Sequence, residues 1–544
     1  MVYNPTMVKR FGIERIISSV LAVGCGILFG QLLVESFTKL TLSDFHVYYY
    51  VTKAVIKYGA HPYSNFTPIY PYYFPPASLI LFWPLTLLPF YLAKIFFTLL
   101  NSGLLVLSIY LINKMLIGKV NYRFWLMLLL SLIFYPLRFT FADGQFNVVM
   151  LAIFTLGLYG LYKNRPVIGG AGLGLGVITK ISPAIALIYG IYKKKFNLVM
   201  VAGIVVIVLS LMSESFVRKD INYYYAKFIV KDVSAQSQGL GTTDQSLLAL
   251  IKRYTHEEDI NISSTQKSII SYSVVAFLGL IFFVLDLKAK KGKYNTFIDY
   301  FILTVVGVIG TGLAWYHQYT ILLLPLLGTA ILIFAHFNKK YRVVRFVYLL
   351  GIVLVYLSWF MDLRSKTFSP EGYCQFIMLY GGGLLLLGLF FLKINQKWLL
   401  EEDLDLTEGY SRKIPFLVFV VALVIGLNPV TLPQVLKEGR DESRVKAIDY
   451  MSKVLKEKKV TFKVEESNSF VMSNRVGKGY IRFGKKQEEK VLDKMYILYE
   501  DPVNNEEYNY KFISEDGLNF KLGSKLESNL YKSLYGDFYW VGSD

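Results

Sequence analysis

Long apolar runs recur along this 544-residue chain and limit its fold more than any other feature. Each has the length of roughly 17–25 residues that a helix needs to cross the hydrocarbon core of a bilayer. About eleven such runs predict a polytopic α-helical membrane protein. The first is interpreted as a retained helix, because it is too long for a cleaved signal peptide. The runs lie at residues 12–34, 91–113, 123–140, 146–162, 197–213, 268–286, 296–313, 317–336, 342–360, 373–391 and 414–430.

Charge and cysteine content exclude several classes of function. Only 18% of the residues are charged, against about 25% in an average soluble domain. The net charge is +19, but the basic residues form short clusters between apolar runs, which indicates membrane topology and not nucleic-acid binding. Cys25 and Cys374 lie far apart and have neither disulfide nor zinc spacing. We therefore expect no metal, no cofactor and no nucleic-acid partner.

The basic clusters also predict how the chain crosses the membrane. Under the positive-inside rule, the clusters at residues 9–15, 114–123, 163–165, 193–195, 288–293 and 339–345 are cytoplasmic. This requires two short or broken helices in residues 166–192, with the glycine run 169–176 and Lys180 to Pro183 as the break at their tip. Residues 76–90, interrupted by prolines, are predicted to be interfacial. The total is about thirteen crossings, with the N-terminus cytoplasmic and the C-terminus extracytoplasmic.

The composition changes after residue 433, so we divide the chain into a membrane domain, 1–433, and a C-terminal domain, 434–544. The C-terminal part carries 20 Lys and Arg and 19 Asp and Glu. Residues 434–459 have helical spacing, and alternating runs follow at 460–464, 480–483, 495–499 and 510–513, with a hairpin turn at 515–517. These patterns predict a small extracytoplasmic α+β domain, whose role the sequence leaves open.

The first external loop contains an acidic residue followed by many aromatic ones. Asp44 could deprotonate a hydroxyl group while neighbouring rings stack on a sugar. Alternatively, Asp44 caps an interfacial helix that begins at His46, and the tyrosines form an interfacial belt. The candidate cavity residues in this loop are His46, Tyr49, His61, Tyr63 and Tyr72.

Polar residues beside later apolar runs could bind a phosphate or sugar hydroxyls. Arg138, Gln145 and Asn147 flank the Asp143-Gly144 turn, and Lys180 follows the glycine run. As alternatives, Arg138 snorkels to the interface, and Lys180 reaches the membrane surface.

Two further segments combine aromatic and polar residues. One loop contains Tyr223 to Tyr225, Gln236, Gln238, Gln245 and Arg253, which suits a carbohydrate groove or an ordinary solvated loop. The other contains Trp315, His317 and Gln318 between two apolar runs. There the competing interpretation is interfacial anchoring, with His317 as a helix cap.

In order along the chain, these segments resemble glycosyltransferase family 87, a family of GT-C superfamily mannosyltransferases that use polyprenyl-phosphate mannose. The resemblance covers about residues 1–390 and rests on VYYYVTKAVIKYGAHPY, YYFPPASLILFWPLTLLP, AKIFFTLLN, DGQFN, TKISP, TDQSLLALIKR and AWYHQY. It implies that Asp44 is the general base and that His317 lies near the donor phosphate. Gln145, Asn147 and Lys180 would shape the donor site, together with Arg138 and, more loosely, Arg253. Gln245 and Gln318 would join the acceptor side.

The resemblance implies an integral-membrane glycosyltransferase of GT-C fold acting on the outer face of a cell membrane. It would transfer a hexose, mannose by analogy, from a polyprenyl-phosphate sugar to a glycan or glycolipid acceptor by one inverting displacement. Phosphate is a competent leaving group, so no second carboxylic acid is required. A transporter or flippase of lipid-linked sugars is the alternative class, although the polar motifs gather on one face and no internal repeat is seen. An oligosaccharide ligase or polymerase is a further alternative. The sugar, the acceptor and the linkage stay open.

Overall fold

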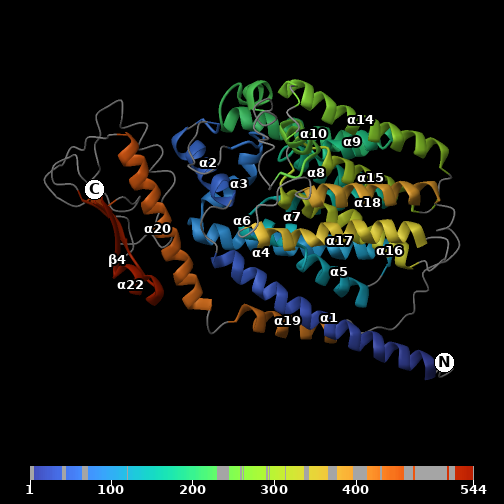
Figure 1. Ribbon diagram of the computed structural model, residues 1–544, viewed down its shortest axis with the longest axis horizontal. Helices are drawn as coiled ribbons and strands as arrows, with labels where there is room; N and C mark the ends of the chain where they lie inside the picture. The colour runs from blue at the N-terminus through green and yellow to red at the C-terminus, as the bar shows by residue number, and fades with distance from the viewer. Residues whose placement is uncertain are drawn as a thin grey trace.

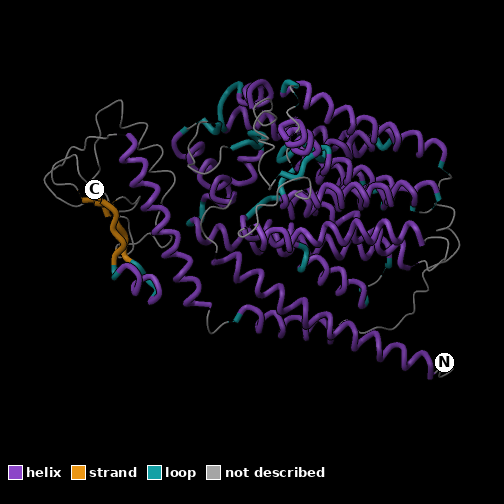
Figure 2. The backbone as a smooth tube through the Cα atoms, viewed as in Figure 1, coloured by secondary structure: helices purple, strands orange, loops and turns teal. Residues whose placement is uncertain are grey.

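The chain folds into a helical bundle with a smaller C-terminal part beside one end (Figure 1). The computed structural model describes residues 5–38, 44–59, 61–63, 72–118, 120–229, 244–257, 260, 262–289, 292, 294–312, 314–335, 342–365, 376–395, 413–428, 432–458, 470–471, 511–513 and 521–542. Within these ranges, strands occur in the C-terminal part alone (Figure 2).

Several described helices are long and apolar enough to cross a bilayer, as expected of a polytopic membrane protein. There are 6 of them, or up to 8 if each of two bent helix pairs counts as one span. The first pair falls in the predicted run 123–140, which is bent by 63° between its two helices. Shorter apolar helices also occur, so the larger number of crossings stays a prediction. The qualifying segments are Ile13–Phe37, Phe90–Leu116, Phe196–Phe216, Ser264–Lys288, Tyr316–Ile333 and Ile377–Ile394.

The helices follow the predicted apolar runs closely, and the segment between the first two predicted runs contains two helices, α2 (Asp44–Tyr58) and α3 (Ser78–Thr86), where interfacial helices were expected. The first half of the bundle comprises α1 (Pro5–Thr38), α2 (Asp44–Tyr58), α3 (Ser78–Thr86), α4 (Phe90–Leu116), α5 (Tyr122–Leu132), α6 (Tyr135–Asp143), α7 (Asn147–Tyr162), α8 (Pro166–Val177), α9 (Ala184–Tyr192) and α10 (Phe196–Phe216). The second half comprises α11 (Ile221–Tyr224), the π-helix η1 (Tyr225–Ile229), α13 (Leu247–Glu257), α14 (Ser264–Lys288), α15 (Asn295–Ile309), the 3₁₀-helix η2 (Tyr316–Leu322), α16 (Leu323–Ala335), α17 (Arg342–Ser365), α18 (Ile377–Ile394) and α19 (Lys413–Leu427).

Helix α8 lies between α7 and α10, and its glycines allow this close contact. A Cβ atom on Gly170 would approach the Leu198 carbonyl oxygen to 2.5 Å, and one on Gly174 the Ala202 oxygen to 2.8 Å. On the α7 side, Gly160 and Gly169 meet backbone to backbone. Small residues at such spacing are typical of helices packed in membranes. The prediction that the glycine run breaks the helix was therefore wrong: the run is helical, and the break follows it.

The N-terminal helix is covered by a helix from much later in the chain. Helix α1 packs along α19, where a Cβ on Gly26 would lie 2.5 Å from the Phe419 oxygen, and one on Gly30 2.5 Å from the Gly426 carbonyl carbon. The two helices run side by side along the lower edge of the bundle in Figure 1. Helices near the two ends of the predicted membrane domain thus pack against each other.

The described C-terminal part combines helix α20 (Leu432–Lys458) with a small antiparallel sheet. The sheet order is β1-β2-β3-β4, and β3 pairs with β4 from Lys521 opposite Gly542 to Lys525 opposite Phe538. The predicted helix 434–459 and the strand within 510–513 coincide with α20 and β2. The other predicted strands, and the turn 515–517, lie outside the described residues. The remaining elements are β1 (Phe470–Val471), β2 (Lys511–Ile513), β3 (Lys521–Lys525), α22 (Asn529–Tyr535) and β4 (Phe538–Gly542).

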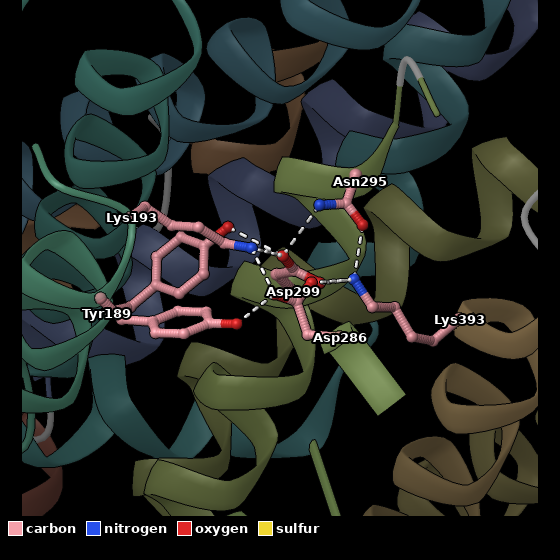
Figure 3. Close-up of polar contacts among 7 residues, drawn as sticks. Tyr189, Lys193, Asp286, Asn295, Asp299 and Lys393 are labelled. Atoms are coloured by element: carbon pink, nitrogen blue, oxygen red, sulfur yellow. Dashed lines mark hydrogen bonds and ion pairs between the residues drawn. The ribbon is translucent and has the colours of Figure 1, made fainter. Parts of the chain in front are cut away.

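A buried ion cluster, which the sequence analysis did not anticipate, joins α9, α14, α15 and α18 (Figure 3). Lys393 donates to Asp286 at 2.6 Å and also pairs with Asp299. Lys193 reaches the same carboxylates at 2.7 and 3.0 Å. The side chains of Lys393 and Asp299 have no exposed surface. Ionised groups between apolar helices are costly unless they are paired, so this cluster binds the four helices together. Hydroxyl groups of Tyr189 and Tyr192 and the amide of Asn295 complete it.

Breaking this cluster should destabilise the bundle strongly. Lys393→Met leaves two buried carboxylates short of a cation, and removing one partner of a buried pair costs about 3–5 kcal/mol. Lys195→Met removes an exposed lysine and is the matched control. Thermal unfolding of the purified protein in lipid nanodiscs should show a clearly lower midpoint for Lys393→Met alone. Equal midpoints for the two variants would contradict the assignment.

Candidate active site

Helix α2 is held over the turn between α6 and α7 by a glycine contact. Gly144 ends α6 in the left-handed conformation, with φ of 63°. A Cβ atom at this position would lie 2.6 Å from the Cβ of Phe45, so the close approach requires glycine. One turn further along α2, the Tyr48 hydroxyl donates to Gln145 Oε1 at 3.1 Å. These contacts fix Asp44, the first residue of α2, near the start of α7.

Lys180 lies in the turn between α8 and α9, where the break in the helical hairpin was predicted. Its Nζ donates to Asn147 Oδ1 at 2.9 Å. Asn147 is the first residue of α7 and is completely buried. Lys180 also interacts electrostatically with Asp44. The structure thus brings the acidic residue of the first loop to the lysine and asparagine of two later motifs.

His317 reaches the same region from the short helix η2. It is buried with 3% exposure, and the ring of Phe139 stacks in parallel on it with centroids 6.0 Å apart. The Thr140 hydroxyl donates to the backbone oxygen of His317 at 3.2 Å. His317 lies within electrostatic range of Lys180. Four of the predicted residues, Asp44, Asn147, Lys180 and His317, therefore converge, and we call them the Asp44 cluster.

Two polar atoms of the Asp44 cluster lack a hydrogen-bond partner within the described part of the chain. They are Nδ1 of His317 and Nδ2 of Asn147, and both are buried. Buried side-chain polar atoms are nearly always paired with protein or ordered water. These two atoms are therefore available to ordered water or to a bound ligand.

The carboxyl group of Asp44 has an unusual acidity. Burial, assisted by the negative charge of Asp143, raises its pKa to about 8, while the positive charge of Lys180 acts in the opposite direction. A general base works best when its pKa lies near the working pH. Asp44 is therefore suited to accept a proton from a bound hydroxyl group.

The aromatic residues of the first loop have two different surroundings. His46 and Tyr49 pack against Phe90, with centroids 5.4 and 5.3 Å away, and the Tyr49 hydroxyl donates to the Leu88 oxygen at 2.7 Å. These contacts anchor α2 on the start of α4. The predicted helix start at His46 was wrong by two residues, since α2 begins at Asp44.

His61, Tyr63 and Tyr72 instead form a wall toward α11. His61 and Tyr63 contact the Tyr224 ring with centroids 4.6 and 5.9 Å away. The Tyr63 hydroxyl donates to the Phe74 oxygen at 2.9 Å, and the Tyr72 hydroxyl bonds to that of Ser78. These contacts join the first loop to the segment that contains Tyr223 to Tyr225. Aromatic residues of both segments thus form one wall.

Arg138 and Arg253 have protein partners in place of a phosphate. Arg138 was predicted to offer donors to a ligand, but its Nη2 pairs with Glu35 of α1 at 2.6 Å, because the two half-exposed groups meet at neighbouring helix ends. Arg253 is buried, and its guanidinium lies 4.5 Å from the Phe376 ring centroid. Their assignment to the donor site stays a prediction without geometric support.

Gln245 and Gln318 belong to a structural connection between two motifs. Asp244 forms a β-bridge with Trp315, and its Oδ1 accepts from the Ala314 N–H at 3.1 Å. The side-chain oxygen of the completely buried Gln245 accepts a hydrogen bond from the Met378 N–H at 3.3 Å. The backbone N–H of Gln318 donates to the Trp315 oxygen at 2.8 Å. The two motifs thus lie together and brace η2. Gln236 and Gln238 lie outside the described residues.

Known proteins resemble this chain in sequence. The model of glycosyltransferase family 87 matches residues 72–361, more than half of the chain. This chain belongs to glycosyltransferase family 87. The family match contains Asn147, Lys180 and His317, whereas Asp44 lies before its first residue.

One curated relative is a polyprenol-phosphate-mannose-dependent alpha-(1-2)-phosphatidylinositol pentamannoside mannosyltransferase of Mycobacterium tuberculosis. It is 22% identical to this family 87 chain over 292 residues, which are 52% of this chain and 65% of the relative. The match thus spans slightly less than two thirds of the relative's length. No solved structure matches the chain significantly.

Three residues of the site escaped the sequence analysis or were given a lesser role. Asp143 and Gly144 were interpreted only as a turn. The negative charge of Asp143 raises the pKa of Asp44, and Gly144, which has no side chain, allows Phe45 to approach closely. Tyr48 was one tyrosine among many, and its bond to Gln145 crosses 97 residues of sequence. Among the described residues, no group of three or more His, Cys, Asp or Glu side chains could hold a metal ion.

Replacing Gly144 should misplace Asp44. Gly144→Ala combines an unfavourable φ with a clash against Phe45, so α2 must shift. Gly59→Ala is the matched control, because Gly59 has a similar φ of 62° and no atom within 4 Å. Displacement of a catalytic group by about 1 Å can reduce rates roughly 10²-fold. We expect sugar transfer to fall by this order for Gly144→Ala and to change little for Gly59→Ala. Equal activities would show that the contact does not position α2.

Proposed function

We propose that this protein is a membrane glycosyltransferase that transfers mannose from a polyprenyl-phosphate donor to a glycan or glycolipid acceptor. Membership of family 87 and the activity for which the mycobacterial relative is named support the reaction class and the donor. The acceptor hydroxyl would enter from the first external loop, between Asp44 and the aromatic wall of His61, Tyr63 and Tyr72. Aromatic rings commonly provide an apolar face with a polar edge, which suits a sugar ring.

The chemical step is a single inverting displacement. Asp44 accepts the proton of the acceptor hydroxyl as its oxygen attacks the anomeric carbon of the donor sugar. The bond between that carbon and the phosphate oxygen breaks, and the electron pair leaves with the polyprenyl phosphate. One base is sufficient, because the phosphate leaves as a stable anion and needs no proton from a second acid.

The leaving phosphate would lie beside Lys180, Asn147 and His317. Lys180 supplies a positive charge, while the amide Nδ2 of Asn147 can donate a hydrogen bond, as can the Nδ1 of His317 when it carries a proton. Charged and neutral donors aimed at developing negative charge lower the barrier most when they are already in place. Lys180 is preorganised by its 2.9 Å bond to Asn147. The outer-face location and the extracytoplasmic C-terminus are part of this proposal, following from the positive-inside rule.

The observation that carries the proposal is the convergence of the Asp44 cluster. A carboxyl group with a pKa of about 8 and a lysine lie together with two buried, unpaired polar atoms, and four distant segments supply them. The two unpaired atoms leave room for hydrogen bonds to a ligand. A base on one side and anion-binding groups on the other match an acceptor hydroxyl and a donor phosphate.

Asp44→Asn should abolish transfer while leaving the fold intact. Loss of a general base reduces rates by about 10²–10⁴-fold. Purified protein in lipid would be assayed with a panel of polyprenyl-phosphate sugars, and the product glycan identified by mass. Asp220→Asn is the control, since Asp220 is exposed and its φ of 65° is tolerated by asparagine. Transfer by Asp44→Asn at a rate similar to Asp220→Asn would refute the assignment of the base.

The pH dependence should move in opposite directions in two variants. Transfer requires ionised Asp44, so kcat/KM should rise with pH through a midpoint near the pKa of about 8 and be lost at lower pH. Lys180→Met removes a positive charge that favours the carboxylate, which raises the midpoint. Asp143→Asn removes a negative charge that opposes ionisation, which lowers it. A midpoint that moves the same way in both variants, or in neither, would contradict Asp44 as the titrating base.

A further inference from the structure

Helix α22, in the C-terminal part, exposes large apolar side chains. Leu530 and Leu534 are 49% and 62% exposed, and Tyr535 is 45% exposed. Residues four apart share one face of a helix, so the two leucines form a continuous apolar ridge. Trp540 on the adjacent strand β4 is 37% exposed. A helix this short gains little stability from its own hydrogen bonds, so a ridge of this kind on it needs an explanation.

The start of α22 is fixed rigidly to α20. The Asp441 carboxylate accepts the backbone N–H groups of Glu527 and Ser528 at 2.9 and 2.6 Å. Arg444, whose side chain is completely buried, pairs with Asp441 at 2.8 Å and with Glu527 at 2.6 Å. Ser528 then caps α22 by accepting the Tyr531 N–H. The leucine ridge therefore moves with α20 and not independently.

The same ion pairs bring the start of α22 close to the first turn of α4, a candidate membrane span. Arg440 pairs with Glu527 at 2.6 Å, and its guanidinium lies 5.7 Å from the ring centroid of Tyr91. Tyr91 is the second residue of α4, a candidate span. Helix α20 itself follows the apolar α19 after a bend of 52°. In Figure 1, α22 lies beside the junction of α19 and α20.

We propose that α22 is an interfacial anchor that inserts Leu530 and Leu534 among the lipid headgroups on the active-site side of the membrane. A lipid surface is favoured because the contacts of Arg440 bring the start of α22 close to α4, where large apolar side chains are also exposed. Leu87 and Leu92, which flank the entry of α4, are 75% and 49% exposed. Tyrosine and tryptophan, found here as Tyr535 and Trp540, are enriched at membrane interfaces. The anchor fixes the height of the C-terminal part above the membrane.

Spin labelling of the full chain in phospholipid nanodiscs tests this location directly. A nitroxide is attached at Leu534→Cys, in a background of Cys25→Ala and Cys374→Ala, and its collisions with oxygen and with a water-soluble nickel chelate are compared. Asn529→Cys is the control, because Asn529 is exposed at the start of the same helix and lies about 140° around the helix axis from Leu534. We expect the ratio of oxygen to nickel collisions to be several-fold higher at 534 than at 529. Leu530→Cys should reproduce the value at 534.

Two results would overturn the proposal. A label at 534 that collides with nickel as freely as the one at 529 would place the ridge in water. A label protected from both reagents would show that protein covers the ridge, either a second copy or another part of this chain. Neither outcome depends on whether the protein transfers mannose, so the anchor and the proposed function stand or fall separately.

Discussion

A charged or polar group between apolar helices is stable only if it meets a partner, and this constraint organises the whole bundle. At one end, Lys193, Lys393, Asp286 and Asp299 neutralise one another within a closed network. At the other end, Lys180 has a bond to Asn147 and faces Asp44, but buried atoms of Asn147 and His317 stay unpaired. The first arrangement is complete without a ligand. The second keeps two buried atoms without a partner among the described residues, which supports the proposal that a ligand binds there.

Glycine contacts bring the polar residues within reach of one another. Helix α8 approaches α7 and α10 through Gly160, Gly170 and Gly174, and α2 approaches the α6–α7 turn through Gly144. Any side chain at these positions would separate the backbones. Polar side chains are short compared with the usual spacing of packed helices. A wider spacing at these glycines would therefore move Asp44 away from Lys180. The geometry that we propose for catalysis thus depends on glycines, which have no functional groups in a side chain.

The sequence was sufficient for the features that depend on local pattern. Run lengths and basic clusters predicted a hairpin in residues 166–192 with Lys180 at its tip, and the acidic residue after the first span was found at α2. What it could not predict were partners chosen by tertiary packing: Glu35 for Arg138, Gln145 for Tyr48, and the carboxylates around Lys393. The glycine run was misplaced for the same reason. Glycine lowers helix propensity in water, whereas between two helices in a membrane it is what permits the helix to fit.

The two polar ends are connected by helices too short to be stable alone. Helix α9 has nine residues, and isolated helices shorter than about 12–15 residues are marginal. Lys180, which is held by Asn147, precedes its first residue, and at its last turn Tyr189 and Tyr192 bond to Asp299 and Asp286. Helix α15 runs the other way, from Asp299 toward the segment that presents His317. The position of Lys180 before α9, where we propose that a phosphate binds, is therefore linked through this short helix to the hydrogen bonds of Tyr189 and Tyr192 at its other end.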